Sequence, residues 1–343
     1  MVTLKESFIN VTKSVNTFKI IIFLRLIVGY HYKITDSKTF ITLLRFYCIC
    51  LCTFCTVRYY VAWHRNLTYS DIFARLEYPV GALFSLITSE EYFLKYCQTI
   101  STGDVIMNYG DTPLIVNYVK FIFILILFFT ITAAYMYYVL HPAELVVALV
   151  SWNILISPYV NYMVILIILS SLHTRMRLLR IFLEKSTRSI SIIGGNEFPL
   201  RVRDVRKSLI NYDHLLNNMQ RVDKQSQFLV CINYLRVKLE QLTTLFHNNL
   251  ILAIVLIYTP GIVAELIIYE VENIRQILTR ALLRCSDESL RYELEILQLY
   301  VRQRPFELKI CGAVPLDGTL PIKITAVCLT YVVVAFQFSH THQ

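Results

Sequence analysis

Two polar side chains near the carboxyl end are the residues best suited to a task that involves water. Thr330 and Gln337 lie within an otherwise apolar stretch, 320–338, which would be about 28 Å long as a helix. An amide in such a stretch needs a partner or a water-filled path. Helical spacing gives one polar and aliphatic stripe, which consists of Val327, Thr330, Val334 and Gln337. This stripe predicts either a face that lines an aqueous path or a face that joins helices through Thr and Gln.

The other candidates for chemistry do not assemble into a catalytic site. His173 and His214 fall in a basic loop, and His340 and His342 fall in the tail. We therefore expect no enzymatic activity, no metal and no cofactor. Four of the nine cysteines crowd one apolar helix, at positions 48, 50, 52 and 55. Their spacing leaves a metal or lipid-linked site open, but packing as small apolar residues is the favoured interpretation.

The composition indicates a polytopic membrane protein. Of 343 residues, 56% are hydrophobic and 17% are charged, whereas soluble domains carry about 25% charge. The net charge of +9 does not indicate nucleic-acid binding, because the basic residues lie in loops beside apolar runs. The first apolar run begins near Phe18, is interrupted by Arg25 and lacks a small-residue cleavage site, so we expect no cleaved signal peptide.

Apolar runs separated by polar loops predict the helices that position the stripe. The stretch 228–248 is a doubtful fifth span, because Arg236, Lys238 and Glu240 lie in its middle, and an amphipathic helix is the alternative. A kink is expected at Pro260. The other six expected spans are 41–63, 72–94, 118–140, 143–172, 249–269 and 320–338.

Loop charges predict the orientation of these spans. The segment before the first span carries six Lys or Arg against two acidic residues, and the loop 173–227 carries eleven against five. The positive-inside rule then places the amino terminus in the cytosol and, with seven spans, the carboxyl terminus outside. Asn66, in Asn66-Leu67-Thr68, becomes an extracellular glycosylation candidate. The stretch 270–309 has seven basic and seven acidic residues around an apolar periodicity, which predicts two packed cytosolic helices.

The final stretch resembles the last-helix signature of insect gustatory receptors. The match is Thr330-Tyr331, five apolar residues, and then Gln337-Phe338. It is specific over about the last fifty residues and weaker over the rest of the chain. Further similar segments are Leu-Arg-Leu-Ile-Val-Gly at 24–29, Arg-Tyr-Glu-Leu at 291–294 with Gln-Leu at 298–299, Pro-Phe-Glu at 305–307, and Leu-Asp at 316–317.

The resemblance implies an all-α, seven-transmembrane helix bundle that acts as a ligand-gated, non-selective cation channel. It implies a homo- or hetero-tetramer, surrounded by membrane lipids, in the plasma membrane of chemosensory neurons. Three parts are expected: 1–227 with four spans and the basic loop, 228–313 with spans five and six and a cytosolic helical region, and 314–343 with the pore helix. The implied pore and gate residues are Thr330, Tyr331, Val334, Gln337 and Phe338.

Two residues depart from that family pattern. Receptors tuned to sugars often carry an acid directly after the Thr-Tyr pair, where this chain has Val332, so we expect a bitter or other non-sugar tastant. Lys323 falls on the pore-side stripe, where four cations would repel permeating cations unless the side chains extend to the interface. The chain is also short for the family.

The ligand candidates lie in the third and fourth expected spans. Aromatic walls with a few polar groups suit a small, partly apolar tastant. An interfacial aromatic belt is the alternative for several of these residues. The candidates are Tyr135 in 118–140, and Trp152, Asn153, Tyr159, Asn161 and Tyr162 in 143–172.

Two other membrane-protein classes remain as alternatives. A G-protein-coupled chemoreceptor also has seven spans, but it would need an extracellular amino terminus, and neither Asp-Arg-Tyr after a third span nor Asn-Pro-x-x-Tyr in the last helix occurs. A transporter would show broken helices at matching positions in two halves, and only Pro260 clearly breaks one here. The receptor-channel is the favoured interpretation.

Overall fold

The residues described by the computed structural model are helical apart from short connecting segments and one two-residue ladder, in which β1 (Lys309–Ile310) pairs antiparallel with β2 (Val314–Pro315). The expectation of an all-α fold is thus confirmed for the described part of the chain. The structure describes residues 21–32, 37–62, 69–88, 96–100, 103–104, 107, 117–140, 145–188, 201–220, 250–307, 309–310, 314–315, 319, 322–323, 326, 330, 333 and 337.

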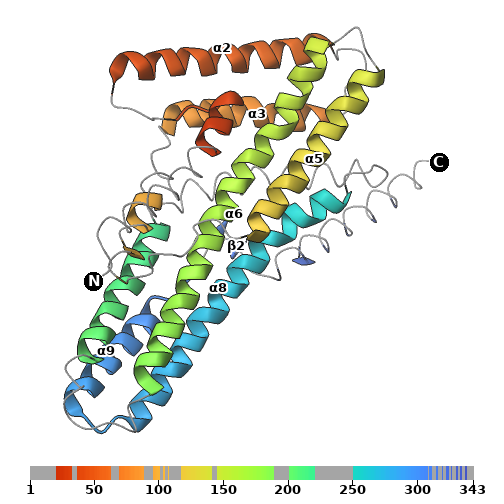
Figure 1. Cartoon of the computed structure of the whole chain (residues 1–343). Coiled ribbons are helices and arrows are strands. Elements are labelled where there is room, and N and C mark those ends of the chain that lie inside the picture. The colour runs from red at the N-terminus through yellow and green to blue at the C-terminus, as the bar shows by residue number, and fades with distance from the viewer. Residues whose placement is uncertain are drawn as a thin grey trace.

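The central element is α6 (Leu145–Arg188), a helix of 44 residues. At about 1.5 Å per residue it is roughly 66 Å long, about twice the thickness of a hydrocarbon core. The expected fourth span, 143–172, lies within this longer helix, which continues to Arg188. α8 (Leu250–Arg284) runs beside α6 and continues through Pro260, so the expected sixth span and the first expected cytosolic helix form one element (Figure 1).

Two helices in the described residues are long and apolar enough to cross a membrane. They are Leu145–Thr187 within α6 and Lys38–Arg58 within α2 (Lys38–Ala62). The apolar window is 88% buried in α6 but only 17% buried in α2, so α6 is a core helix and α2 is largely exposed. Length and composition alone do not distinguish a span from the core helix of a soluble protein.

Four helices pack together at the lower end of the molecule in Figure 1. We call this group the lower bundle; it comprises residues 166–188 of α6, the helix 201–220, residues 263–284 of α8, and α9 (Glu288–Gln303). Helix 201–220 runs parallel to α9, because the pairs 206–293, 213–300 and 217–304 all have the same sequence separation of 87. The sequence prediction of two packed helices within 270–309 is confirmed by α8 and α9.

The start of α9 is encoded locally. The side chain of Asp287 accepts a hydrogen bond from the backbone N–H of Leu290 at 2.7 Å, and Glu288 places a negative charge in the first turn. Beyond this cap, apolar residues recur at helical spacing and form the buried face of α9, which comprises Leu290, Leu294, Leu297 and Val301.

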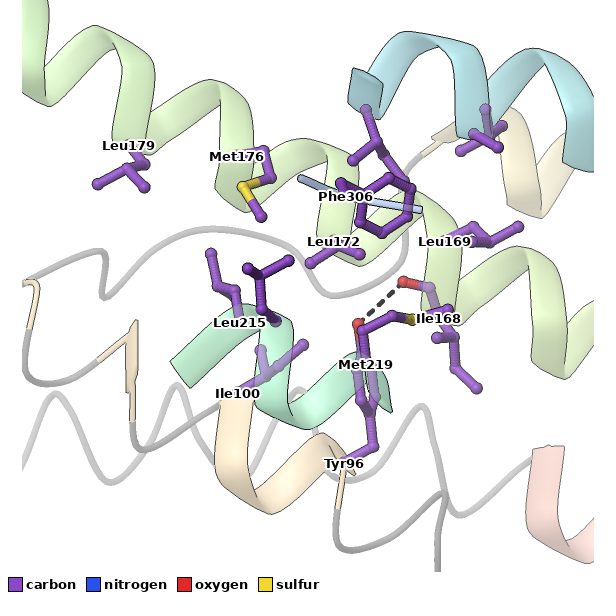
Figure 2. Close-up of a cluster of buried hydrophobic side chains, with 14 of the residues drawn as sticks. Tyr96, Ile100, Ile168, Leu169, Leu172, Met176, Leu179, Leu215, Met219 and Phe306 are labelled. Atoms are coloured by element: carbon purple, nitrogen blue, oxygen red, sulfur yellow. Dashed lines mark hydrogen bonds between the residues drawn. The ribbon is translucent and has the colours of Figure 1, made fainter. Parts of the chain in front are cut away.

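The lower bundle shares its core with a short helix at 96–100. Figure 2 shows Tyr96 and Ile100 of that helix against α6 and against Leu215 and Met219 of helix 201–220. The Tyr96 hydroxyl donates to the carbonyl of Ile168 at 2.9 Å, so its polar end is satisfied inside an aliphatic core.

The upper end of the molecule is arranged differently. α5 (Asn117–Leu140) lies along the upper half of α6, whereas α2 and α3 (Tyr69–Thr88) lie across its end (Figure 1). The described helices therefore do not show seven aligned spans, and that bundle stays a prediction. The doubtful fifth span, 228–248, lies outside the described residues, and the last expected span is described at seven positions, counting Thr319 just before it.

Candidate functional site

The described positions near the carboxyl end form one continuous exposed stripe. They follow one another at spacings of one, three or four residues, and every one of them is exposed. Thr330 donates from Oγ1 to the carbonyl of Ala326 at 2.9 Å, and the backbone N–H of Lys323 donates to the carbonyl of Thr319 at 3.0 Å. Both are bonds between residues four apart, as in a helix. We call these positions the terminal stripe: Thr319, Ile322, Lys323, Ala326, Thr330, Val333 and Gln337.

The terminal stripe contains part of the predicted pore set. Thr330 and Gln337 lie on it, and both face outward from the single chain. Tyr331, Val334 and Phe338 lie outside the described residues, as does the glycosylation candidate Asn66. One chain presents this stripe but encloses no path with it, so any aqueous path along the stripe needs further copies or a partner.

The ligand candidates do not converge on one site. Tyr135 is exposed on α5, whereas Tyr159 and Tyr162 are buried in the same aliphatic core as the lower bundle. Trp152 is half-buried and packs against a second, upper core. Asn153 donates from Nδ2 to the sulfur of Cys55 at 3.4 Å.

Three of these candidates carry buried polar atoms with no hydrogen-bond partner. They are Nε1 of Trp152, Oδ1 of Asn161 and the hydroxyl of Tyr162. An unsatisfied buried polar atom costs about 1–3 kcal/mol, so these three atoms would gain from a bound molecule or water. Asn161 is buried in the helix packing, and its contact with a ligand stays a prediction.

The sequence did not indicate how firmly the segment 21–32 enters the upper core. Tyr30 lies 2.5 Å from the Ser157 hydroxyl of α6, and Tyr78 of α3 donates to the carbonyl of Val28 at 2.9 Å. Gly29 has φ +95°, and a Cβ there would lie 2.8 Å from the Tyr78 hydroxyl. Gly29 itself was the available signal, since glycine is the residue that adopts positive φ without a steric penalty.

His31 is fully buried in that segment. Its backbone N–H donates to the Ser85 hydroxyl at 3.0 Å, but both ring nitrogens lack partners. Burial, and next the nearby positive charge of Arg45, lower the pKa of His31, so the imidazole is neutral at physiological pH.

The upper core contains two of the four clustered cysteines. Cys52 and Cys55 of α2 are buried there among aliphatic and aromatic side chains, and both are free thiols. The packing interpretation is confirmed for these two residues. Among the residues that the structure describes, no three His, Cys, Asp or Glu side chains come close enough to hold a metal ion.

Charged side chains in the lower bundle are paired across helices. Asp104 receives two hydrogen bonds from Arg175, from Nε at 3.0 Å and from Nη2 at 2.6 Å. Burial raises the pKa of Asp104 above its usual range although Arg175 opposes the shift. Arg180 of α6 pairs with Glu270 of α8 at 2.6 Å, which ties those two helices together.

A second polar group joins helix 201–220 to the end of α9. Burial raises the pKa of Tyr212 to about 12, so its hydroxyl stays protonated and donates to the carbonyl of Arg304 at 3.0 Å. Asp213 accepts from Tyr300 and from Arg304. These contacts fix the parallel register of the two helices.

Comparison with known proteins adds no family assignment. No protein-family model matches this chain, and no curated protein is significantly similar to it in sequence. The gustatory-receptor resemblance of the terminal helix therefore stays a prediction.

Proposed function

We propose that the chain is a subunit of a gustatory-receptor-like, ligand-gated cation channel of the plasma membrane. The observation that carries the proposal is the terminal stripe, because Thr330 and Gln337 of the Thr-Tyr-x5-Gln-Phe signature lie on a face that the chain itself leaves uncovered. The terminal stripe presents hydroxyl, aliphatic and amide groups. When several subunits arrange this face around a symmetry axis, they can enclose a water-filled path that no single subunit encloses.

Exposed apolar faces support membrane embedding. On α5 the exposed large side chains recur at spacings of three and four, and on α2 they follow the helix along most of its length. Soluble monomers rarely expose contiguous apolar patches of this kind. The exposed members on α5 are Phe121, Ile124, Phe128, Ile131, Tyr135 and Tyr138.

The location of the charged segments supports the proposed orientation. Residues 96–104, the end of α6, helix 201–220 and α9 all meet at the lower end of the molecule. The loop charges assign each of them to the cytosolic side if the first six expected spans all cross the membrane. One common location for all four segments is what that topology requires.

We further propose that four subunits, identical or mixed, surround the pore and that the ligand is a small non-sugar tastant. Val332 in place of an acid favours that ligand class. Trp152 and Asn161 are the best ligand candidates, because each has a buried polar atom that the chain does not satisfy.

Gln337→Ala in cells that give a ligand-evoked current tests the pore assignment. We expect altered conductance or altered block by permeant cations, because the amide ring would be removed from the narrowest part of the path. The measurement is single-channel recording under fixed ionic gradients.

Val332→Ala is the matched control, since helical spacing puts residue 332 on the opposite side from Gln337. It should leave conductance unchanged. Equal behaviour of the two variants, with normal surface expression, would contradict the proposal.

A further inference from the structure

Three polar side chains lie on one face of helix 201–220 without partners for their nitrogen atoms. Asn211, His214 and Asn218 are spaced by three and four residues, so they form a stripe along two turns. Asn211 is 7% exposed and Asn218 is 4% exposed, while His214 is half-buried. The Nδ2 atoms of both amides and Nδ1 of His214 are buried with no hydrogen-bond partner. Buried polar groups are nearly always satisfied, so three such nitrogens on one face indicate a missing partner.

The chain brings a glycine to this face. A Cβ on Gly103 would lie 3.5 Å from Nδ1 of His214 and 3.7 Å from Oδ1 of Asn211. The carboxamide of Asn211 and the imidazole of His214 therefore both face Gly103. Oδ1 of Asn211 is the atom nearer to Gly103, so the carboxamide must turn by 180° to present Nδ2 to an anion at this point. His214 and Asp104 are each only half-buried, which leaves a route from solvent.

The acidic groups of the adjoining segments already have partners. Asp104 uses both carboxylate oxygens to accept from Arg175, and Nη1 of Arg175 donates to the carbonyl of Ser171 at 3.1 Å. Asp213, on the same helix, accepts from Asn217, Tyr300 and Arg304 instead. No described residue satisfies the three nitrogens, which leaves them open to a bound molecule.

The chemistry of the three nitrogens selects an anion with several acceptor oxygens. Carboxamide nitrogens only donate, and an imidazole nitrogen can donate when it carries the proton. A carboxylate offers two oxygens, whereas a tetrahedral oxyanion offers enough for three separate donors. Helix 201–220 carries four basic residues against two acidic ones, and the adjacent end of α6, residues 175–188, carries five against one. Three of these arginines also form ion pairs with acids of neighbouring segments: Arg175 with Asp104, Arg180 with Glu270 and Arg206 with Glu293.

We propose that this face binds one small tetrahedral oxyanion of the phosphate class, held by Asn211, His214 and Asn218 beside Gly103. The bound anion lies between the segment at 103–104 and helix 201–220. It therefore links these two segments, both of which lie beside α6. This site is separate from the terminal stripe, and its test does not depend on channel activity.

The test uses the purified full-length chain in detergent with inorganic phosphate as the probe. Equilibrium dialysis with radiolabelled phosphate, at ionic strength held constant with chloride, should give saturable binding of one phosphate per chain. Saturating phosphate should also raise the Tm by about 3 °C relative to chloride, because a ligand that binds only the folded chain stabilises it.

Two variants remove the site in different ways. Asn218→Leu removes one donor, and Asn218→Asp keeps the shape but adds a charge that repels the anion. Each should weaken phosphate binding at least about tenfold, which corresponds to about 1.4 kcal/mol of binding free energy. If the leucine variant does not fold, the aspartate variant supplies the comparison.

Two control variants separate the site from general charge and helix effects. Arg203→Gln removes an exposed positive charge on the same helix, and Asn217→Leu removes the neighbouring amide, which already donates to Asp213 at 2.8 Å. Both should leave the phosphate Kd within about twofold. No saturable binding, or an equal loss of binding in Arg203→Gln, would overturn the proposal, as would an Asn218→Leu chain that gains stability and still binds phosphate normally.

Discussion

The two ends of α6 are surrounded by different kinds of surface. At the lower end, helix 201–220, α8 and α9 cover α6, and side chains such as Leu294 are fully buried while the charges pair across helices. At the upper end, α5 and α2 cover α6 but leave their own outer faces apolar, with Phe128 64% exposed. The lower bundle thus completes its own core, whereas the upper end leaves apolar outer faces uncovered in the single chain.

The largest expected contrast between the two ends comes from truncating one apolar side chain in each. Leu294→Ala should lower the free energy of unfolding by about 2–5 kcal/mol, because it leaves a cavity in a closed core. Phe128→Ala should change it by less than about 0.5 kcal/mol, because that ring faces outward. Chemical unfolding in detergent, followed by circular dichroism, measures both. Similar losses in the two variants would show that the outer face of α5 is packed in the folded protein.

The next contrast concerns two glycines, one at each end. Gly29→Ala should cost about 2 kcal/mol or more, since φ +95° is unfavourable for alanine and the new Cβ would lie 2.8 Å from the Tyr78 hydroxyl. Gly103→Ala should stay within about 1 kcal/mol of the parent chain without phosphate, because its Cβ would make only ordinary contacts at 3.5 Å and beyond. Thermal unfolding of both variants in chloride buffer provides the comparison. A tolerated alanine at 29 would mean that segment 21–32 does not enter the upper core.

The smallest expected effect is a pH dependence that is confined to the lower bundle. Burial raises the pKa of Asp104 in the folded chain, so the folded state binds this proton more tightly than the unfolded state. The stabilisation from this group is therefore complete below its ordinary pKa of about 4 and is lost as the pH rises through the folded pKa. Asp104→Asn removes that titration.

The difference in unfolding free energy between the parent and Asp104→Asn should accordingly favour the parent most at acidic pH and shrink as the pH rises. Urea unfolding of both chains between pH 4 and pH 7 measures this difference in unfolding free energy. Subtracting one chain from the other cancels the pH dependence of the carboxylates that both chains share. A difference that grows with rising pH would show that Arg175, rather than burial, dominates the Asp104 environment.

Local sequence features predicted the helices well. The apolar periodicity after Asp287 predicted α9, and the continuous apolar run after 143 predicted a helix that exceeds membrane length. Both patterns arise from hydrogen bonds and side-chain spacing within one short segment, so no distant residue is needed to recognise them. The expected end of the sixth span at residue 269 was wrong as a helix boundary, because α8 continues without interruption to Arg284.

The grouping of the ligand candidates was not predictable in the same way. Tyr135 and Tyr159 carry the same side chain and both lie in apolar helices, yet one is exposed and the other is buried. Periodicity shows which residues share a face, but it does not show what the face meets. For that reason the candidates of α5 and α6 divide between the outer surface, the upper core and the lower core.

By itself the sequence determined an all-helical, strongly apolar chain with a polar and aliphatic stripe near its end. Only the tertiary structure decided that the terminal stripe is uncovered, that α6 rather than α2 is the core helix, and that Asn211 and His214 meet at Gly103. The physical reason is range. Helix formation depends on neighbours within about four residues, whereas burial and pairing depend on contacts such as Asp104 with Arg175, which lie 71 residues apart.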